Sequence, residues 1–100
     1  MPAETAHGVA FGALRVAHRL PGIAAALRAS YGVSQPELSV SALGLHFQSP
    51  VLLAAGFDKH ALGYNALGDL GFGGIEVGTI TGEAQSGNPR PRLFRLARDR

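Results

Sequence analysis

Two short stretches of the chain carry residue types that could hold a flat ligand beside a fixed charge. The first spans residues 55–59, and the second is the hydroxyl residue Thr79. Ala55 and Gly56 are small, so a planar cofactor could approach their backbone without meeting a bulky side chain. Lys59 is the only lysine, and a cation there could bind a substrate carboxylate or stabilise negative charge that develops on a reduced cofactor. The Thr79 hydroxyl could hydrogen-bond a ring heteroatom.

Each of these features also has a purely structural interpretation, which the residue types alone leave open. Small residues at the end of a strand commonly serve close packing, and neighbouring charges such as Asp58 and Lys59 commonly form a solvated pair. The four histidines do not have the spacing of a metal site, and no carboxylate completes a set of ligands. We therefore predict no metal ion in this chain.

The hydrophobic pattern places both stretches at the ends of parallel strands. Residues 51–55 are continuously apolar between Pro50 and Gly56, which is typical of a strand buried on both faces. A helix is expected over residues 61–70 and a second strand over residues 74–80. Strand, helix and strand form one right-handed βαβ unit, whose strands end at the same edge. Parallel α/β proteins place their binding residues just beyond that edge.

Helices and a hairpin are expected before this unit, and an irregular segment after it. The first helix carries an apolar stripe at helical spacing, and Gly32 is expected to end the second helix in the left-handed C′ position. Alternating apolar and polar residues around Gly44 predict a half-exposed antiparallel hairpin. In chain order we expect helices at residues 3–20 and 23–31, strands at 38–42 and 45–48, a loop at 82–92 and a short strand at 93–96.

Composition limits the class of protein. One hundred residues form one small domain and fall far short of the roughly 250 residues of a complete (β/α)₈ barrel. Hydrophobic residues make up 46% and charged residues 16%, which favours a buried core over a disordered chain. No cysteine is present, so disulfides, thiolate metal sites and a cysteine nucleophile are excluded within this chain.

The net charge of +2 results from two basic ends around an acidic middle, which is not the uniform positive face of a nucleic-acid binder. The first residues lack the basic region of a signal peptide, and no apolar run predicts a membrane span. The first two helices are amphipathic and carry three arginines, so they could lie in a bilayer interface. They could equally be a helical cap that packs on the rest of the chain.

Three blocks, at residues 49–59, 70–81 and 87–96, together resemble the quinone-dependent (class 2) dihydroorotate dehydrogenases. The likeness covers nearly the whole chain and implies an α/β fold, with a helical hairpin at residues 1–36 and the first βαβ portion of a (β/α)₈ TIM barrel at residues 37–100. The barrel would be incomplete. The resemblance also implies an FMN site, formed by Ala55, Gly56, Phe57, Asp58, Lys59 and Thr79.

Further roles follow from the same resemblance. Lys59 matches a lysine that also contacts orotate, whereas His7 and Arg95 match residues that line a quinone tunnel. The family oxidises dihydroorotate to orotate in pyrimidine (UMP) biosynthesis and passes the electrons through FMN to a membrane quinone. Its catalytic serine base has no counterpart in this chain, so the chain alone is expected to be inactive. The implied location is peripheral, through residues 1–36, on the cytoplasmic face of a bacterial membrane. The alternative is a non-catalytic membrane-surface or interaction module.

Overall fold

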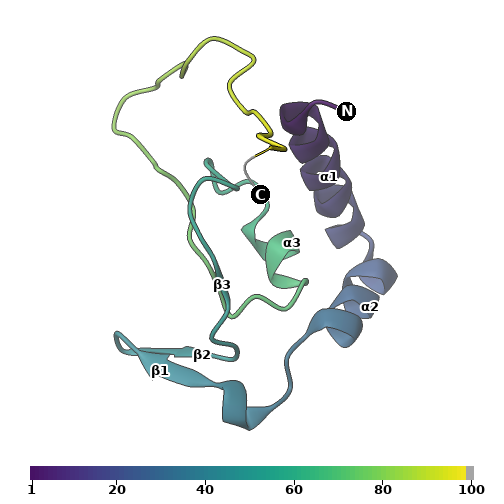
Figure 1. The fold of residues 1–100 in the computed structure, drawn as a ribbon. Helices are drawn as coiled ribbons and strands as arrows, with labels where there is room; N and C mark the ends of the chain where they lie inside the picture. Colours follow the sequence, from purple (N-terminus) through teal and green to yellow (C-terminus); the bar gives the residue numbers. More distant parts are fainter. Residues whose placement is uncertain (99–100) are drawn as a thin grey trace.

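Two N-terminal helices lie beside a small βαβ unit, and a hairpin projects from one end of the molecule (Figure 1). The computed structural model describes residues 1–98. The chain forms, in order, α1 (Ala3–His18), α2 (Pro21–Tyr31), the 3₁₀ turn η1 (Pro36–Leu38), β1 (Val40–Ala42), β2 (Leu45–Phe47), β3 (Leu52–Leu53), α3 (Tyr64–Gly68) and β4 (Gly74–Ile75).

The break between α1 and α2 is set by proline. A residue before proline is pushed out of the helical region, and Leu20 is extended at φ −93° and ψ 108°. Pro21 then starts α2, where its missing N–H is not needed. The first helix is therefore shorter, and the second starts earlier, than predicted. The second helix ends at Tyr31, before Gly32, as predicted, but Gly32 is extended at φ −61° and ψ 140° and not in the left-handed C′ conformation. A side chain there would collide with the carbonyl of Arg28.

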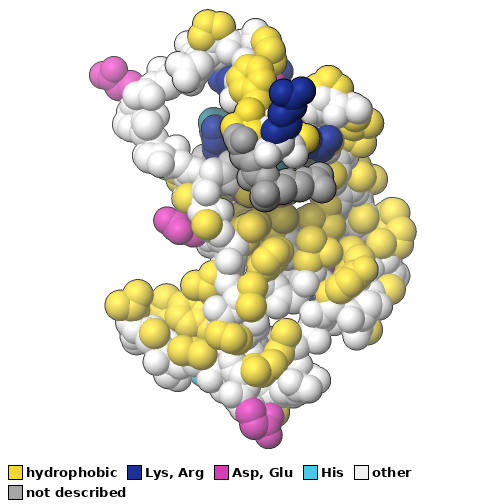
Figure 2. All heavy atoms as spheres, viewed as in Figure 1, with side chains coloured by type: hydrophobic (Ala, Val, Ile, Leu, Met, Phe, Trp, Pro, Cys, Tyr) yellow, Lys and Arg dark blue, Asp and Glu magenta, His cyan; other side chains and the backbone are white. Residues whose placement is uncertain are grey.

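The predicted hairpin is confirmed, with a two-residue turn. β1 and β2 are antiparallel, and Val40 pairs with Phe47. Leu43 and Gly44 both have positive φ, at 54° and 73°, which is the geometry of a type I′ turn. The hairpin is more exposed than predicted, because all three residues of β1 face solvent. Figure 2 shows apolar side chains gathered over this hairpin.

The βαβ unit is confirmed in its connectivity, and β3 and β4 are parallel neighbours. Leu52 lies opposite Gly74 and Leu53 opposite Ile75. The pairing continues past the assigned strands, since Glu76 N donates to the Leu53 carbonyl at 2.9 Å. A side chain at Gly73 would collide with the Ser49 carbonyl, so this return turn needs glycine.

Both parallel strands are shorter than predicted: β3 covers residues 52–53 of the expected 51–55, and β4 covers 74–75 of the expected 74–80. The predicted burial of β3 is also wrong. β3 is not buried on both faces: Val51 is 59% and Leu52 51% exposed. The reason is that β3 has one strand neighbour among residues 1–98, so its second edge and much of its surface stay uncovered. The expected strand over residues 93–96 does not form, and these residues are exposed. No closed barrel exists in the described part of the chain.

Candidate functional site

The ends of the two parallel strands are tied together by backbone hydrogen bonds. Gly56 N donates to the Gly78 carbonyl at 3.1 Å, and Gly78 N donates to the Asp58 carbonyl at 3.2 Å. The structure therefore brings residues 55–59 beside Gly78 and the adjoining Thr79, as the sequence predicted for one sheet edge. We call residues 55–59 with Gly78 and Thr79 the rim.

Most of the rim is open to solvent. Ala55, Gly56, Lys59 and Thr79 are all exposed. Gly56 has a φ of +105°, which requires glycine, and a Cβ placed there would meet nothing within 4 Å. The backbone at Gly56 is thus accessible to a flat group. Within residues 1–98, this openness fits a planar cofactor.

Asp58 does not form a solvated pair with Lys59. Asp58 is only 1% exposed, and its two carboxylate oxygens accept hydrogen bonds from the backbone N–H groups of Leu62 and Gly63, each at 2.8 Å. These bonds hold the loop that leads into α3. Asp58 can therefore offer a ligand its backbone but not its carboxylate, and the positive charge of Lys59 stays uncompensated by it.

Helix α1 touches the rim directly through an aromatic cluster. His7 donates from Nε2 to the Phe57 carbonyl at 3.0 Å. Because a carbonyl can only accept, this nitrogen carries a proton. The His7 and Phe57 rings meet edge-on at 4.5 Å between centroids, and Phe11 packs on Phe57 at 5.6 Å. One of the two predicted quinone-tunnel residues thus contacts the predicted cofactor segment.

Arg95, the other predicted tunnel residue, lies near the start of α1. Its Nη1 donates to the Met1 carbonyl at 3.5 Å. The same end of α1 also holds the preceding loop, because the carboxylate of Glu4 pairs with Arg90 at 3.1 Å and with Arg92 at 3.5 Å. The C-terminal segment consequently arches back to α1 (Figure 1). His7 and Arg95 are therefore both near the N-terminal part of this helix.

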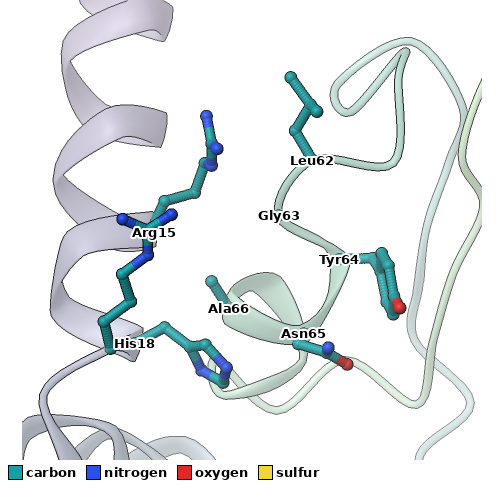
Figure 3. A pocket seen from close by; sticks show the side chains of 8 residues that line it. Arg15, His18, Leu62, Gly63, Tyr64, Asn65 and Ala66 are labelled. Carbon is teal, nitrogen blue, oxygen red and sulfur yellow. The ribbon is translucent and has the colours of Figure 1, made fainter.

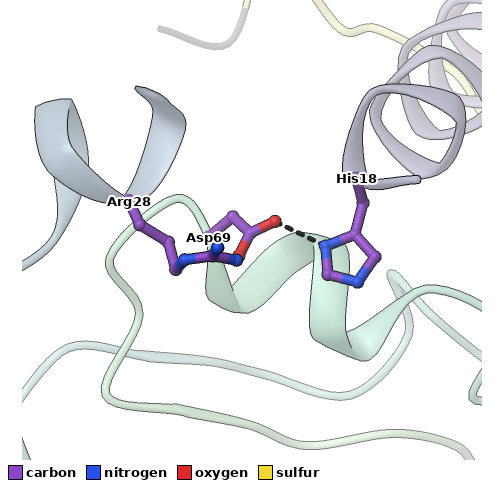
Figure 4. A network of polar contacts seen from close by, with 3 residues as sticks. All are labelled: His18, Arg28 and Asp69. Carbon is purple, nitrogen blue, oxygen red and sulfur yellow. Dashed lines mark hydrogen bonds and ion pairs between the residues drawn. The ribbon is translucent and has the colours of Figure 1, made fainter. Parts of the chain in front are cut away.

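A second polar cluster, which was not predicted from the sequence, connects both helices to the end of α3. Asp69 is 4% exposed, and it accepts His18 Nδ1 at 2.6 Å and Arg28 Nη1 at 2.9 Å (Figure 4). Burial by itself would raise the pKa of Asp69, but the hydrogen bonds and charges of His18 and Arg28 outweigh it and lower that pKa below 3.8. A signal existed: an acid at the C-terminal end of a helix opposes the helix dipole, and so needs cationic partners.

A small cavity of about 110 Å³ separates the C-terminal half of α1 from α3 (Figure 3). It is lined by Arg15, His18, Arg19, Leu62, Gly63, Tyr64, Asn65 and Ala66. No predicted site residue lines it. The rim and this cavity therefore share no residue.

Comparison with known proteins gives a consistent result. A family model described as dihydroorotate dehydrogenase matches residues 37–100. The dihydroorotate dehydrogenase (quinone) of Thermobifida fusca is 52% identical over 98 residues, which are 98% of this chain and 26% of that protein. The protein of the same name from Halobacterium salinarum is 52% identical over 99 residues, 99% of this chain and 28% of its own length. The chain therefore spans about a quarter of the length of these curated relatives.

The fold agrees as well. A solved structure of DHODH from Eimeria tenella in complex with ferulenol superposes with a TM-score of 0.71 and 43% identity, and the match covers 96% of this chain and 23% of that one. Its ligand-free counterpart from the same organism gives a TM-score of 0.63 at 46% identity, over 84% of this chain and 24% of that one. These structural neighbours imply a TIM-barrel family, and the described residues form a small α/β part of such a barrel. By the family match, the near-complete coverage by relatives and this structural likeness, the chain belongs to the dihydroorotate dehydrogenase family.

Proposed function

We propose that this chain is the N-terminal part of a quinone-dependent dihydroorotate dehydrogenase, which oxidises dihydroorotate to orotate in UMP biosynthesis. The observation that carries the proposal is the contact between α1 and the rim, where His7 donates to the Phe57 carbonyl. A residue proposed to line the quinone path is thereby attached to the segment proposed to line the cofactor. In this proposal residues 1–36 form the quinone-access hairpin and residues 37–100 begin the barrel.

The residues of the rim fit FMN. Bound FMN would supply two-electron redox chemistry. Ala55 and Gly56 would leave an open backbone ledge for a flat ring, and exposed Thr79 would offer its hydroxyl. Exposed Lys59 would hold the carboxylate of dihydroorotate and stabilise negative charge on the reduced ring. Phe57 and Asp58 would contribute through their backbone, since the Asp58 carboxylate is occupied by Leu62 and Gly63.

Electrons would leave towards a quinone near His7 and Arg95. We place this quinone at the surface of a bacterial membrane, on the cytoplasmic face, with α1 and α2 lying on the bilayer. Support comes from exposed apolar side chains on these helices, among them Val9 at 58% and Val16 at 59%. Among residues 1–98, no helix is both long and apolar enough to span a bilayer.

The catalytic base would be a serine supplied by residues that follow this chain in the proposed full enzyme. The 100-residue chain by itself is therefore expected to bind FMN weakly or not at all, and to show no turnover. Purification of the chain followed by measurement of flavin absorbance and dihydroorotate oxidation tests this expectation. A stoichiometric flavin band together with dihydroorotate oxidation would contradict it.

The coding DNA after codon 100 tests the proposal as a whole. We expect an in-frame continuation that encodes an Asn-Arg-x-Gly-Phe-Asn segment. The complete product should purify with flavin and reduce a quinone with dihydroorotate, and Lys59→Ala should abolish turnover. A complete product that has no flavin absorption band, or that does not oxidise dihydroorotate, would overturn the proposal.

A second candidate is a non-catalytic membrane-surface or interaction module. The exposed apolar residues of α1 and the basic side chains next to them favour it. Flotation of the full chain with anionic vesicles, in the absence of flavin, tests this candidate. Flotation without any flavin binding by the complete product would favour the module over the enzyme, and failure to float would remove the module's support.

A further inference from the structure

Two arginines line the cavity between α1 and α3. Arg15 and Arg19 lie one helical turn apart, and Figure 3 shows Arg15 reaching into the space between α1 and residues 62–66. Among residues 1–98, neither forms an ion pair with a carboxylate. Like charges at this spacing repel each other on a helix. An anion bound between them would remove that repulsion.

The surroundings of the two arginines favour an anion. None of the eight lining residues is acidic. Two buried carboxylates lie close to the lining residues, and both are engaged: Asp69 by His18 and Arg28, and Asp58 by the backbone N–H groups of Leu62 and Gly63. The Asn65 side chain points away from α1, so the charge on the cavity wall comes from α1 (Figure 3). Arg15 is partly held in place, because its guanidinium carbon lies 5.9 Å from the centre of the Phe11 ring.

The chemistry and size of the cavity point to a phosphate group. Guanidinium groups present paired donors that match the oxygens of a phosphate. A cavity of about 110 Å³ admits a compact anion and is too small for the whole of a large ligand. We infer that Arg15 and Arg19 form a binding site for a phosphate group, as free phosphate or as the headgroup of a lipid.

The position of the two arginines on α1 would allow the phosphate group to come from solution or from a lipid. At 100° per residue, His7, Phe11 and His18 occupy the face of α1 that packs on the rest of the chain. Arg15 and Arg19 form the edge of that face. Val9 and Val16, both more than half exposed, lie on the next strip of the helix. A lipid could thus place its phosphate between the arginines and its chains along the valines. This lipid source rests on the membrane association proposed above, and the free-phosphate source does not.

The test uses the full chain with two probes. The first probe is inorganic phosphate, followed through the Nε–H NMR signals of the arginines. The second is sedimentation with vesicles of phosphatidylglycerol, compared with vesicles of phosphatidylcholine. Arg15→Gln and Arg19→Gln should each weaken saturable phosphate binding by about tenfold. Arg98→Gln removes the same charge from an exposed position in the C-terminal segment, and it should leave phosphate binding unchanged.

Arg15→Lys and Arg19→Lys separate a specific site from general attraction. They keep the charge but lose the paired donors, so phosphate binding should fall while binding to anionic vesicles through overall charge persists. Far-UV circular dichroism confirms that each variant keeps its helices. Loss of vesicle binding in the glutamine variants identifies the lipid source, and loss of phosphate binding alone identifies free phosphate. Two results would overturn the inference. The first is that phosphate causes no saturable shifts at Arg15 and Arg19 and that all variants bind vesicles equally. The second is that Arg98→Gln loses as much phosphate or vesicle binding as the variants of Arg15 and Arg19. Flavin binding by the complete enzyme is measured separately and does not bear on this result.

Discussion

Asp58 and Lys59 are adjacent in the sequence but have opposite environments. The Asp58 carboxylate is buried and accepts two backbone N–H groups, whereas Lys59 is exposed. Asp58→Ala leaves two backbone donors of the loop without a partner. We expect it to lower the free energy of unfolding by about 1–3 kcal/mol. Lys59→Ala should change it by less than about 0.5 kcal/mol. Urea unfolding of both variants checks this, and an equal loss in both would show that the two residues act together.

Asp69 connects the acid stability of the chain to the attachment of its helices. Asp69→Asn removes the negative charge that His18 and Arg28 share but keeps the shape of the side chain. We expect a loss of about 1–3 kcal/mol at neutral pH, as for hydrogen bonds to a charged group. Glu76→Gln, which alters an exposed carboxylate, is the matched control and should have little effect.

The pH dependence of this loss has a defined sign. The pKa of Asp69 is lowered in the folded chain below 3.8, its unfolded value, so the unfolded state takes up the proton first as the pH falls. The stabilisation by Asp69 is therefore fully present above pH 3.8 and disappears as the pH drops through the lower, folded pKa. Urea midpoints of the native chain and Asp69→Asn should converge in strong acid. A constant difference down to the lowest pH would mean that the charge contributes nothing.

At the level of elements, α1 is attached to the rest of the chain at two points. His7 and His18 are eleven residues apart, which is three helical turns, so they project from one face over about 16 Å. His7 reaches the Phe57 carbonyl, and His18 reaches the Asp69 carboxylate. Between them Phe11 packs on Gly63. This arrangement fixes the helix both along its length and around its axis.

Gly63 permits the close approach of α1 and α3. A Cβ at Gly63 would lie 2.5 Å from Cε2 of Phe11, so Gly63→Ala must displace the ring. We expect a cost of about 1–3 kcal/mol, typical of overpacking. Gly68→Ala is the matched control, because nothing lies within 4 Å of its Cβ and alanine favours a helix by about 0.5–1 kcal/mol.

A double-mutant cycle with Phe11→Ala isolates the contact. The cost of Gly63→Ala should largely disappear when Phe11 is already alanine, because the ring that it strikes is gone. Unfolding midpoints of the four chains give the coupling energy. If the two costs simply add, the close packing of Phe11 on Gly63 does not govern the position of α1.

The sequence predicted the order of these elements but not their limits. The apolar patterns identified both helices and the βαβ unit, because one buried face repeats along each element. The start of α3 was predicted at residue 61 but lies at Tyr64. Ala61 has a φ of 55°, which is incompatible with a right-handed helix, and the N–H groups of Leu62 and Gly63 are bound to Asp58. That hydrogen bonding depends on tertiary contacts and leaves no periodic signal.

The same distinction applies to the candidate site. The sequence indicated that residues 55–59 and Thr79 lie at one sheet edge, since the ends of parallel strands meet. It did not reveal which way the Asp58 carboxylate turns. It also missed the Asp69 cluster, whose three members are separated by up to 51 residues. Partners so far apart in the chain are brought together only by the packing of α1 and α2 on α3.

For the whole molecule, the accessible surface is larger than its mass predicts. A folded monomer of 10.4 kDa ordinarily exposes about 5,400 Å², whereas this chain exposes 7791 Å². Its radius of gyration is 15.8 Å, compared with about 13 Å for a domain of 100 residues. Among residues 1–98, the buried apolar residues are Ala24, Ala66 and Leu67. Under the proposed function, the rest of the barrel would cover the surplus apolar surface.

This surplus surface leads to a prediction about unfolding. The slope of the unfolding free energy against urea is proportional to the surface that unfolding newly exposes. Relative to an unfolded chain of the same mass, this chain buries about three-quarters of the surface that an ordinary monomer buries. We expect its urea slope to be about three-quarters of the usual value, and 1-anilinonaphthalene-8-sulfonate to fluoresce strongly on the exposed apolar side chains. Addition of the remaining barrel segment as a separate chain should raise the slope and quench that fluorescence, because the strand edges of β3 and β4 then gain partners.

A normal slope without dye fluorescence in the chain alone would mean that it packs as a self-sufficient domain, and the barrel interpretation of residues 37–100 would then lose its physical basis.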